Sequence, residues 1–408
     1  MNQKEAKKWF FKCMAALGTA LFLTATVVII VDPYFHYHKP FSFLSYRLYE
    51  ERYINDGISR HFDFDALITG TSMAQNFKPS QMDALFGTNS VKETFSGAGY
   101  QEISENLDRA LSRNKNLKQV IWTLDYNGLL RDYDWVKYEE YPTYLYDDNP
   151  FNDVSYLFNK SILYHGVLSN IAATLSGMPS TTMDEYSSWQ RETGLEKILS
   201  SYDRDNVNTD DPTDFGEEER QAVIKTIRLN VINIVKRYPD TTFYIFYPPY
   251  SICYWDALNI KGTISRQLMA EQTATELLLT CPNVKLYNFY DQYDIICNPD
   301  YYSDDGHYCA EINSRILNWI AEGTGLITKE NYLEKLAQEK EFYSNYDYES
   351  IYNNQRVPGF TRQLINRVGE IFSPLSHHQY VPFGIRRFNI TSKRDAHCSN
   401  RDSLPVLP

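Results

Sequence analysis

The chain carries too little positive charge for a nucleic-acid-binding protein. Its 408 residues include 40 Lys and Arg against 52 Asp and Glu, which gives a formal net charge of −12. Binding to a phosphate backbone requires a basic surface, and an acidic chain does not supply one. We therefore expect no nucleic-acid partner.

Cysteine is also scarce, with six residues, and no two of them show C-x-x-C spacing. A structural zinc site is built from such pairs, so this class of site is not expected. No internal repeat is visible. Tyrosine, by contrast, is abundant at 33 residues. Its flat ring with a polar tip suits sugar-like ligands, although ordinary core and surface use explains the count first.

The N-terminal region contains an uncharged apolar run at residues 13–31, CMAALGTALFLTATVVIIV. Its 19 residues approach the roughly 20 that cross a bilayer, and four lysines precede it. We predict a cytoplasmic segment at 1–12, an uncleaved transmembrane anchor at 13–31, and the remainder of the chain outside. A cleavable signal peptide is the rival interpretation, but no small residues end the run. A buried core helix is the other alternative.

Short apolar runs alternate with helical patterns after Asp65, and this predicts an α/β fold with a parallel sheet covered on both faces. The predicted strands are Ala66–Thr69, Val91–Phe95, Val120–Leu124, Thr242–Tyr247 and Val284–Phe289. The predicted helices are Pro79–Phe86, Glu102–Arg113, Glu217–Arg237, Ile264–Leu279 and Ala310–Ile320.

Two regions break this rhythm. Residues 128–215 are rich in Tyr, Asp, Asn and Ser, and we interpret them as a partly helical insertion that forms a lid or one wall of a site. The α/β domain would occupy residues 32–330. Residues 331–408 are expected to form an irregular C-terminal extension, because periodicity is lost from about residue 343.

Three polar residues follow predicted strands and therefore belong at one edge of the sheet. Ser72 lies in Gly-Thr-Ser directly after the first strand, while Asp304 and His307 lie between the last strand and the last helix. The carboxyl ends of parallel strands meet at one edge, where ligands bind. A serine nucleophile needs a base, and a histidine base needs an acidic residue to orient it. We expected Gly306 to permit the tight turn that folds Asp304 back onto His307.

These blocks resemble the SGNH/GDSL hydrolase superfamily. The segments VDPYFHYHKPF, DALITGTSMAQNF and SDDGHY are similar to those of membrane-anchored bacterial members, such as the D-alanyl-lipoteichoic acid and alginate O-acetylation proteins that work beside a membrane-bound O-acyltransferase. The resemblance covers about residues 32–325. It implies a flavodoxin-like three-layer α/β/α sandwich, an acyl-serine intermediate, and no metal or cofactor.

The sequence departs from that family in two blocks. Thr71 stands where the first block usually has Asp, as in the acyltransferase-like branch. The third block usually supplies an Asn to bind the oxyanion, and Asn127 is the candidate here although its register is shifted; Asp125 is instead a structural or substrate-contacting carboxylate. Gly99 is our choice for the second-block glycine, with Gly97 as the alternative.

The resemblance implies a serine esterase or O-acyltransferase that acts outside the membrane on an acylated cell-envelope glycan or lipid. A multi-span membrane-bound O-acyltransferase is the implied partner. Hydrolysis of lipids or small esters is a second candidate function. A non-catalytic envelope assembly protein that keeps the fold is the alternative from another class.

Overall fold

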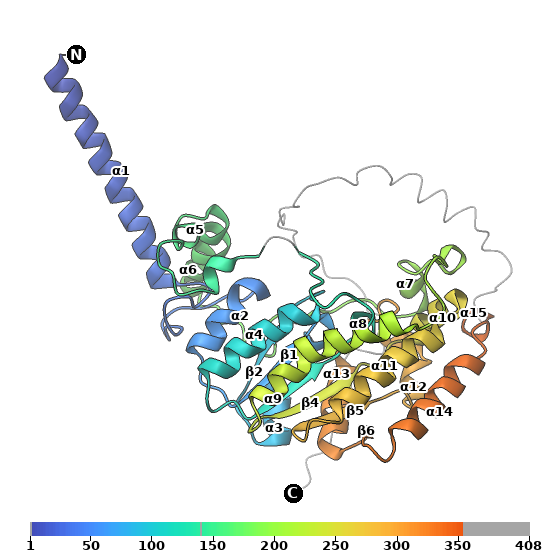
Figure 1. Cartoon of the computed structure of the whole chain (residues 1–408). Helices are drawn as coiled ribbons and strands as arrows, with labels where there is room; N and C mark the ends of the chain where they lie inside the picture. The colour runs from blue at the N-terminus through green and yellow to red at the C-terminus, as the bar shows by residue number, and fades with distance from the viewer. Residues whose placement is uncertain (1, 139–140, 354–408) are drawn as a thin grey trace, which may run out of the picture.

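The computed structural model describes residues 2–138 and 141–353, and it begins with one long helix that stands apart from the body of the protein. Helix α1 (Gln3–Val31) projects away from the domain in Figure 1, and only Val28 and Val31 of it are buried. Its most apolar window has a mean hydropathy of 2.4, which is apolar enough to cross a membrane. The alternative of a buried core helix is therefore wrong.

The domain is built on a six-stranded sheet whose strand order is β2-β1-β3-β4-β5-β6. Strands β2 to β5 run parallel to β1, and β6 is antiparallel to β5. The prediction of a parallel sheet is therefore confirmed except at its last edge. The strands are β1 (Ala66–Gly70), β2 (Ser90–Thr94), β3 (Gln119–Thr123), β4 (Thr242–Tyr247), β5 (Val284–Asn288) and β6 (Leu326–Ile327).

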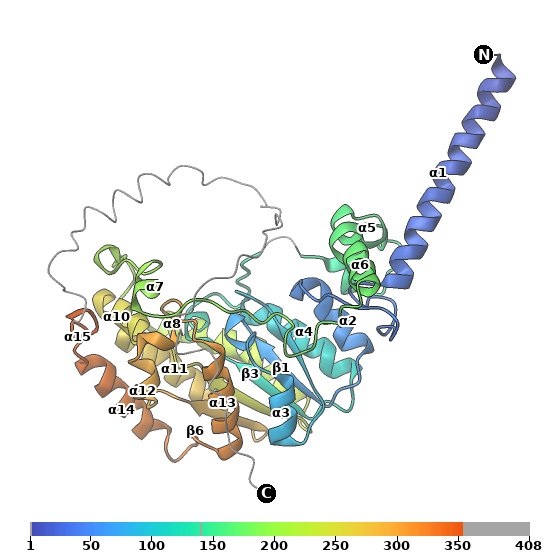
Figure 2. The ribbon, with the colours of Figure 1, turned by 180° about the vertical axis from the view of Figure 1, so that it is seen from behind.

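Helices lie on both faces of this sheet, as two opposite views show (Figures 1 and 2). The helices cover the strands from both sides, so β1 and β2 are buried at every position. On the face seen in Figure 1 lie α2 (Glu51–His61), α4 (Tyr100–Arg113), α8 (Glu217–Ile227), α9 (Asn233–Arg237) and α11 (Ile264–Leu278). On the face seen in Figure 2 lie α3 (Pro79–Phe86) and α13 (Ala310–Glu322).

The C-terminal extension was predicted to be irregular from residue 331, and this is wrong for its first part, because residues 332–345 form a packed helix. Helix α14 (Tyr332–Asn345) buries Glu339 and Tyr343, each 1% exposed. The Tyr343 ring stacks on Trp255 of helix α10 (Ile252–Lys261), with ring centroids 3.7 Å apart. A short helix, α15 (Ser350–Asn353), follows, and the rest of the extension lies outside the described residues.

The insertion at residues 128–215 is partly helical, as predicted. It contains several short helical segments, and the first of them lie beside the domain end of α1 in Figure 1. These segments are α5 (Val154–Leu157), a π-helix η4 (Ile162–Leu168), α6 (Ser169–Leu175) and α7 (Leu195–Leu199).

Candidate active site

The loop after β1 presents Ser72 at the carboxyl edge of the sheet. Gly70 has φ of +148°, and a Cβ atom there would lie only 2.2 Å from Oγ1 of Thr123 on the neighbouring strand. Only glycine fits this crossing, so the chain turns sharply into the short 3-10 helix η1 (Ser72–Ala74). Ser72 is half-buried at the start of that turn.

Side chains from the end of the chain hold this turn in place. Asn313, on α13, donates from Nδ2 to the carbonyl oxygen of Met73 over 2.8 Å, and the Tyr308 hydroxyl donates to the same oxygen over 3.4 Å. Both donors are buried. The loop that carries Ser72 and the segment that carries His307 are therefore fixed to each other by bonds that do not involve the Ser72 or His307 side chains.

Ser72, His307 and Asp304 form one continuous hydrogen-bonded chain. Ser72 Oγ lies 2.7 Å from Nε2 of His307, although the two residues are 235 positions apart in sequence. His307 Nδ1 lies 2.8 Å and 2.9 Å from the two carboxylate oxygens of Asp304. The structure thus brings together the three residues selected from the sequence.

The state of Asp304 fixes the direction of these bonds. Burial raises the pKa of this carboxyl, but hydrogen bonds from His307 and from the backbone of Gly306 outweigh it and leave the pKa below its ordinary value. The carboxylate is then ionised and only accepts hydrogen bonds, so Nδ1 of His307 carries a proton. In the neutral imidazole, Nε2 is consequently the acceptor for the Ser72 hydroxyl.

The loop that carries Asp304 and His307 is closed by its own backbone. The backbone N–H of Ser303 donates to the carbonyl oxygen of His307 over 2.9 Å, and Ser251 donates from both N and Oγ to the carbonyl oxygen of Asp305. Gly306 is not required for this turn, since a Cβ there would meet its nearest atoms at 3.8 Å, an ordinary contact. Our expectation for Gly306 was therefore wrong.

The insertion supplies two site residues that the sequence did not reveal. The Trp189 ring packs edge-on against the His307 ring at 5.6 Å, and Nη1 of Arg191 lies 3.6 Å from Oδ2 of Asp304. The Trp189 backbone N–H donates to Oδ1 of Asn76 over 2.8 Å, which ties the insertion to the segment after Ser72. These residues lie in a stretch without periodicity, so no pattern distinguished them.

A second carboxyl, that of Asp125, contacts the loop that carries Ser72. The Thr71 hydroxyl donates to the side chain of Asp125, which follows β3 and is 4% exposed. Burial raises the pKa of Asp125 to about 6, although the Thr71 hydrogen bond and the nearby His307 pull it down. Asp125 is thus a buried partner of Thr71, the residue directly before Ser72.

The two predicted oxyanion donors are less closely tied to this chain. Gly99 precedes α4, and a Cβ there would lie 2.1 Å from the carbonyl oxygen of Trp135. Asn127 is exposed. Within the described residues, no hydrogen bond joins either of them to Ser72 or His307.

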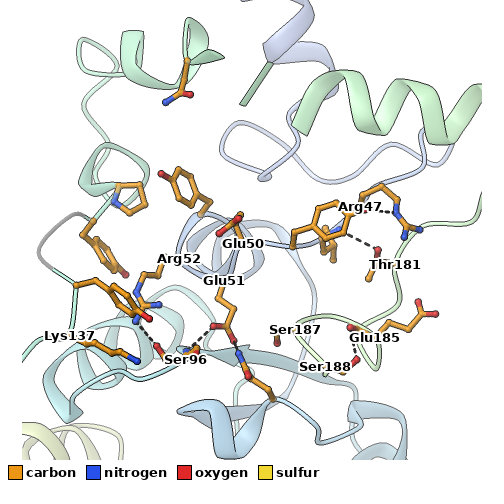
Figure 3. Close-up of a pocket in the computed structure, with 18 of the residues that line it drawn as sticks. Arg47, Glu50, Glu51, Arg52, Ser96, Lys137, Thr181, Glu185, Ser187 and Ser188 are labelled. Atoms are coloured by element: carbon orange, nitrogen blue, oxygen red, sulfur yellow. Dashed lines mark hydrogen bonds between the residues drawn. The ribbon is translucent and has the colours of Figure 1, made fainter. Parts of the chain in front are cut away.

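A polar groove of about 1160 Å³ opens beside this edge of the sheet (Figure 3). Glu51 lies at its centre and accepts hydrogen bonds from Gln75, which follows β1, and from the backbone N–H of Ser96, which follows β2. Gln75 lies three positions after Ser72 in the sequence, and Ser72 and His307 are not among the residues that line the groove. Its aromatic lining consists of Tyr49, Tyr53, Tyr138, Tyr141 and Tyr144.

Comparison of the chain with protein-family models, with curated proteins and with solved structures finds no match.

Proposed function

We propose that the protein is a membrane-anchored serine esterase or O-acyltransferase of the SGNH/GDSL type. The observation that carries this proposal is the hydrogen-bonded chain from Ser72 through His307 to Asp304. Nucleophile, base and orienting carboxylate are each within hydrogen-bond distance of the next, which is the arrangement that activates a serine. The direction of the two hydrogen bonds supports these roles, because Nδ1 of His307 donates to Asp304 and leaves Nε2 free to accept the Ser72 proton.

In the proposed reaction, Ser72 Oγ attacks an ester carbonyl while His307 takes the hydroxyl proton at Nε2. Collapse of the tetrahedral intermediate breaks the bond to the leaving alkoxide, which receives that proton, and leaves an acyl-serine. Water or an acceptor hydroxyl then attacks the acyl-serine with the same base. We assign the oxyanion to the backbone N–H groups of Ser72 and Gly99 and to Asn127, each donor contributing about 3 kcal/mol.

We assign the five parallel strands to the flavodoxin-like order, because β2-β1-β3-β4-β5 follows the 2-1-3-4-5 pattern of that doubly wound class. Helices on both faces fit its three layers. In such sheets the ligand lies where the strand order reverses, between the loops after β1 and β3. The contact between Thr71 and Asp125 joins those two loops.

We propose that α1 is an uncleaved anchor that leaves the domain outside the cell membrane. The lysines before the apolar run favour a cytoplasmic N-terminus. The domain packs on the last turn of α1 through the buried Val28 and Val31, which suits a permanent segment better than a signal peptide removed after export.

The groove beside the site supports a polymeric acceptor. Tyrosine rings together with carboxylate and guanidinium groups offer the stacking surfaces and hydrogen bonds that a glycan uses. A multi-span membrane-bound O-acyltransferase that supplies the acyl group is the partner implied if the protein is a transferase. Hydrolysis of a small ester or lipid remains the second candidate.

Turnover of p-nitrophenyl acetate tests the proposal. The purified full-length chain is expected to release p-nitrophenol, and Ser72→Ala is expected to abolish release without a change in unfolding midpoint. Addition of O-deacetylated envelope glycan should divert the acetyl group from water to glycan if the protein is a transferase. Equal rates for the wild type and Ser72→Ala would favour the non-catalytic assembly protein.

A further inference from the structure

The insertion carries a patch of exposed apolar side chains next to the end of α1. Seven of the exposed large apolar residues outside α1 lie between positions 151 and 178. Isolated exposed apolar residues are ordinary, but a contiguous group marks a surface that is covered in use. The juxtamembrane patch, as we call it, consists of Phe151, Val154, Phe158, Tyr164, Leu168, Leu175 and Met178.

The helix formed by η4 and α6 is apolar on its exposed side as well as on most of its buried side. Its outward side chains at spacings of four and seven residues are Tyr164, Leu168 and Leu175, which are 60%, 51% and 83% exposed. Its inward face is formed by Ile162, Gly166, Val167, Asn170 and Ala173. A surface helix of a soluble domain points its apolar side inward, so the outward side of this helix is built for an apolar environment.

This segment also lacks the charge that covers the rest of the protein. Between positions 151 and 178 the only acidic residue is Asp153, which is buried and hydrogen-bonded to His36 and Tyr37. Lys160 is the one exposed Lys or Arg. The exposed carboxylates nearest to it in sequence, Asp147 and Asp148, precede the segment, and within it an exposed lysine and no exposed carboxylate suit a lipid surface.

The patch is joined rigidly to the base of the anchor. The Tyr156 hydroxyl donates to Oδ1 of Asp32 over 2.8 Å, directly after α1 ends. A Cβ at Gly166 would lie 2.8 Å from the Pro33 ring, so the π-helix and the anchor boundary are in close contact. Both views show α5 and α6 beside the domain end of α1 (Figures 1 and 2).

We propose that the juxtamembrane patch inserts into the headgroup–acyl boundary of the same bilayer that α1 crosses. The proposal rests on α1 being a membrane anchor. Aromatic and aliphatic side chains with a lysine nearby are the composition of helices that lie in this interface. Continuity with the anchor favours lipid over a separate protein partner, because the bilayer necessarily begins where α1 ends. A second contact with the membrane would stop the domain from rotating freely about α1.

Fluorescence quenching in vesicles tests this placement. The full-length chain carries Cys13→Ser and either Leu175→Cys or, as the matched control, Leu333→Cys, and is labelled with nitrobenzoxadiazole. Leu333 is also exposed, at 57%, but lies on α14 at the far end of the domain from α1. The other cysteines are common to both proteins, so their contribution cancels. Vesicles contain phosphatidylcholine and phosphatidylglycerol, with or without a nitroxide on the acyl chain.

We expect acyl-chain nitroxide to lower the emission of the label at 175 about twofold or more, and to leave the label at 333 nearly unchanged. Flotation of the chain with the vesicles is measured on the same sample. Flotation without quenching at 175 would overturn this inference while leaving the anchor intact, and equal quenching at both sites would overturn it as general adsorption. If position 175 is not quenched and instead cross-links to a second chain, the occupant of the patch is another copy of this protein and the lipid proposal is overturned. Failure to float would overturn the anchor together with the patch, and p-nitrophenyl acetate turnover then reports on the catalytic proposal separately.

Discussion

The Thr71 hydroxyl donates a hydrogen bond to the buried carboxyl of Asp125, and this bond links the residue before the nucleophile to the end of β3. Both residues are at most 6% exposed. The carboxyl therefore has little access to water, and burial has the largest effect on its pKa. Ionisation of a buried carboxyl destabilises the folded state, so the free energy of unfolding depends on pH.

We expect Asp125→Asn to remove part of the pH dependence of folding. Burial raises the pKa of Asp125 to about 6 from 3.8, so the folded state holds this proton more tightly than the unfolded state. Its contribution to the free energy of unfolding is present at low pH and is lost as pH rises from about 4 to about 6, on the order of 3 kcal/mol in all. Urea unfolding at pH 4 and pH 8 measures it. An unchanged pH slope in the variant would contradict the assignment.

The buried Glu271 and Glu339 should make the docking of α14 weaken as pH rises from acid through neutral values. Asn288 donates from Nδ2 to both carboxyls, over 2.6 Å and 3.1 Å. Burial raises the pKa of Glu271 to about 8, and burial together with Glu271 raises that of Glu339 well above its usual value. Stability is therefore predicted to fall as pH rises from about 4.5 to about 8.

We expect Glu339→Gln to flatten that decline, because an amide removes one of the two competing negative charges and keeps a similar shape. Thermal unfolding followed from pH 5 to pH 9 checks it. Glu334→Gln, on the same helix, is the matched control and should decline as the wild type does. If Glu339→Gln loses stability with rising pH as steeply as the control, then ionisation of the Glu271–Glu339 pair does not cause the decline.

Trp189 is predicted to support the base from the insertion. Its ring packs edge-on against His307, so Trp189→Ala should lower turnover about tenfold through a looser imidazole, while Trp189→Phe should retain most of it. Arg191→Ala should cost less than about threefold, because its side chain is 46% exposed and its ion pair with Asp304 is screened by solvent. Steady-state kinetics of the three variants on one ester substrate separates these effects. Equal losses for Ala and Phe at position 189 would argue against a ring contact.

The contrast between Asp304 and Asp305 tests which carboxylate orients the base. Asp304→Asn should reduce turnover by about 10²- to 10⁴-fold, because an amide no longer holds Nδ1–H of His307 in the same tautomer. Asp305→Asn should stay close to the wild-type rate, since Asp305 meets Ser251 through its backbone carbonyl rather than its side chain. The kcat of both variants is measured at the same pH. A severe loss of turnover in Asp305→Asn would instead assign the orienting role to Asp305.

Most of the sheet was predictable from sequence because β1, β3 and β4 are largely apolar runs; β2 and β5 contain charged residues, and β6 was not predicted. Every predicted strand is present within about one residue of its place, as is the buried face of the helix over 217–237. The structure adds a π-helical segment, η6 (Arg228–Ile232), inside that helix. Local sequence does not reveal such a change of hydrogen bonding, because the buried positions stay on one side.

Other elements were missed for physical reasons. Helix α2 buries Asn55, Asp56 and Ser59 beside Ile54 and Ile58, so its inward face is largely polar and its apolar stripe is short. Asp56 is instead held there by three arginines, at positions 60, 109 and 113. The buried face of α14 likewise includes a carboxyl, Glu339.

The candidate site was predictable where it lies on the parallel strands and not where it depends on the insertion. Ser72 and His307 could be paired because both follow strands that end at one edge. Trp189 and Arg191 reach the same place through a long irregular segment, whose path is set by contacts such as the one from Trp189 to Asn76. Contacts of this kind depend on the folded domain and leave no period in the sequence.

The central claim is that Ser72 is a nucleophile activated by His307, and covalent labelling tests it most directly. The full-length protein is incubated with a fluorophosphonate probe, digested, and the modified peptide is identified by mass spectrometry. We predict a single adduct on Ser72, absent in Ser72→Ala, strongly reduced in His307→Ala, and retained in Asp305→Asn. An unlabelled wild-type protein, or an adduct that persists in Ser72→Ala, would contradict the account.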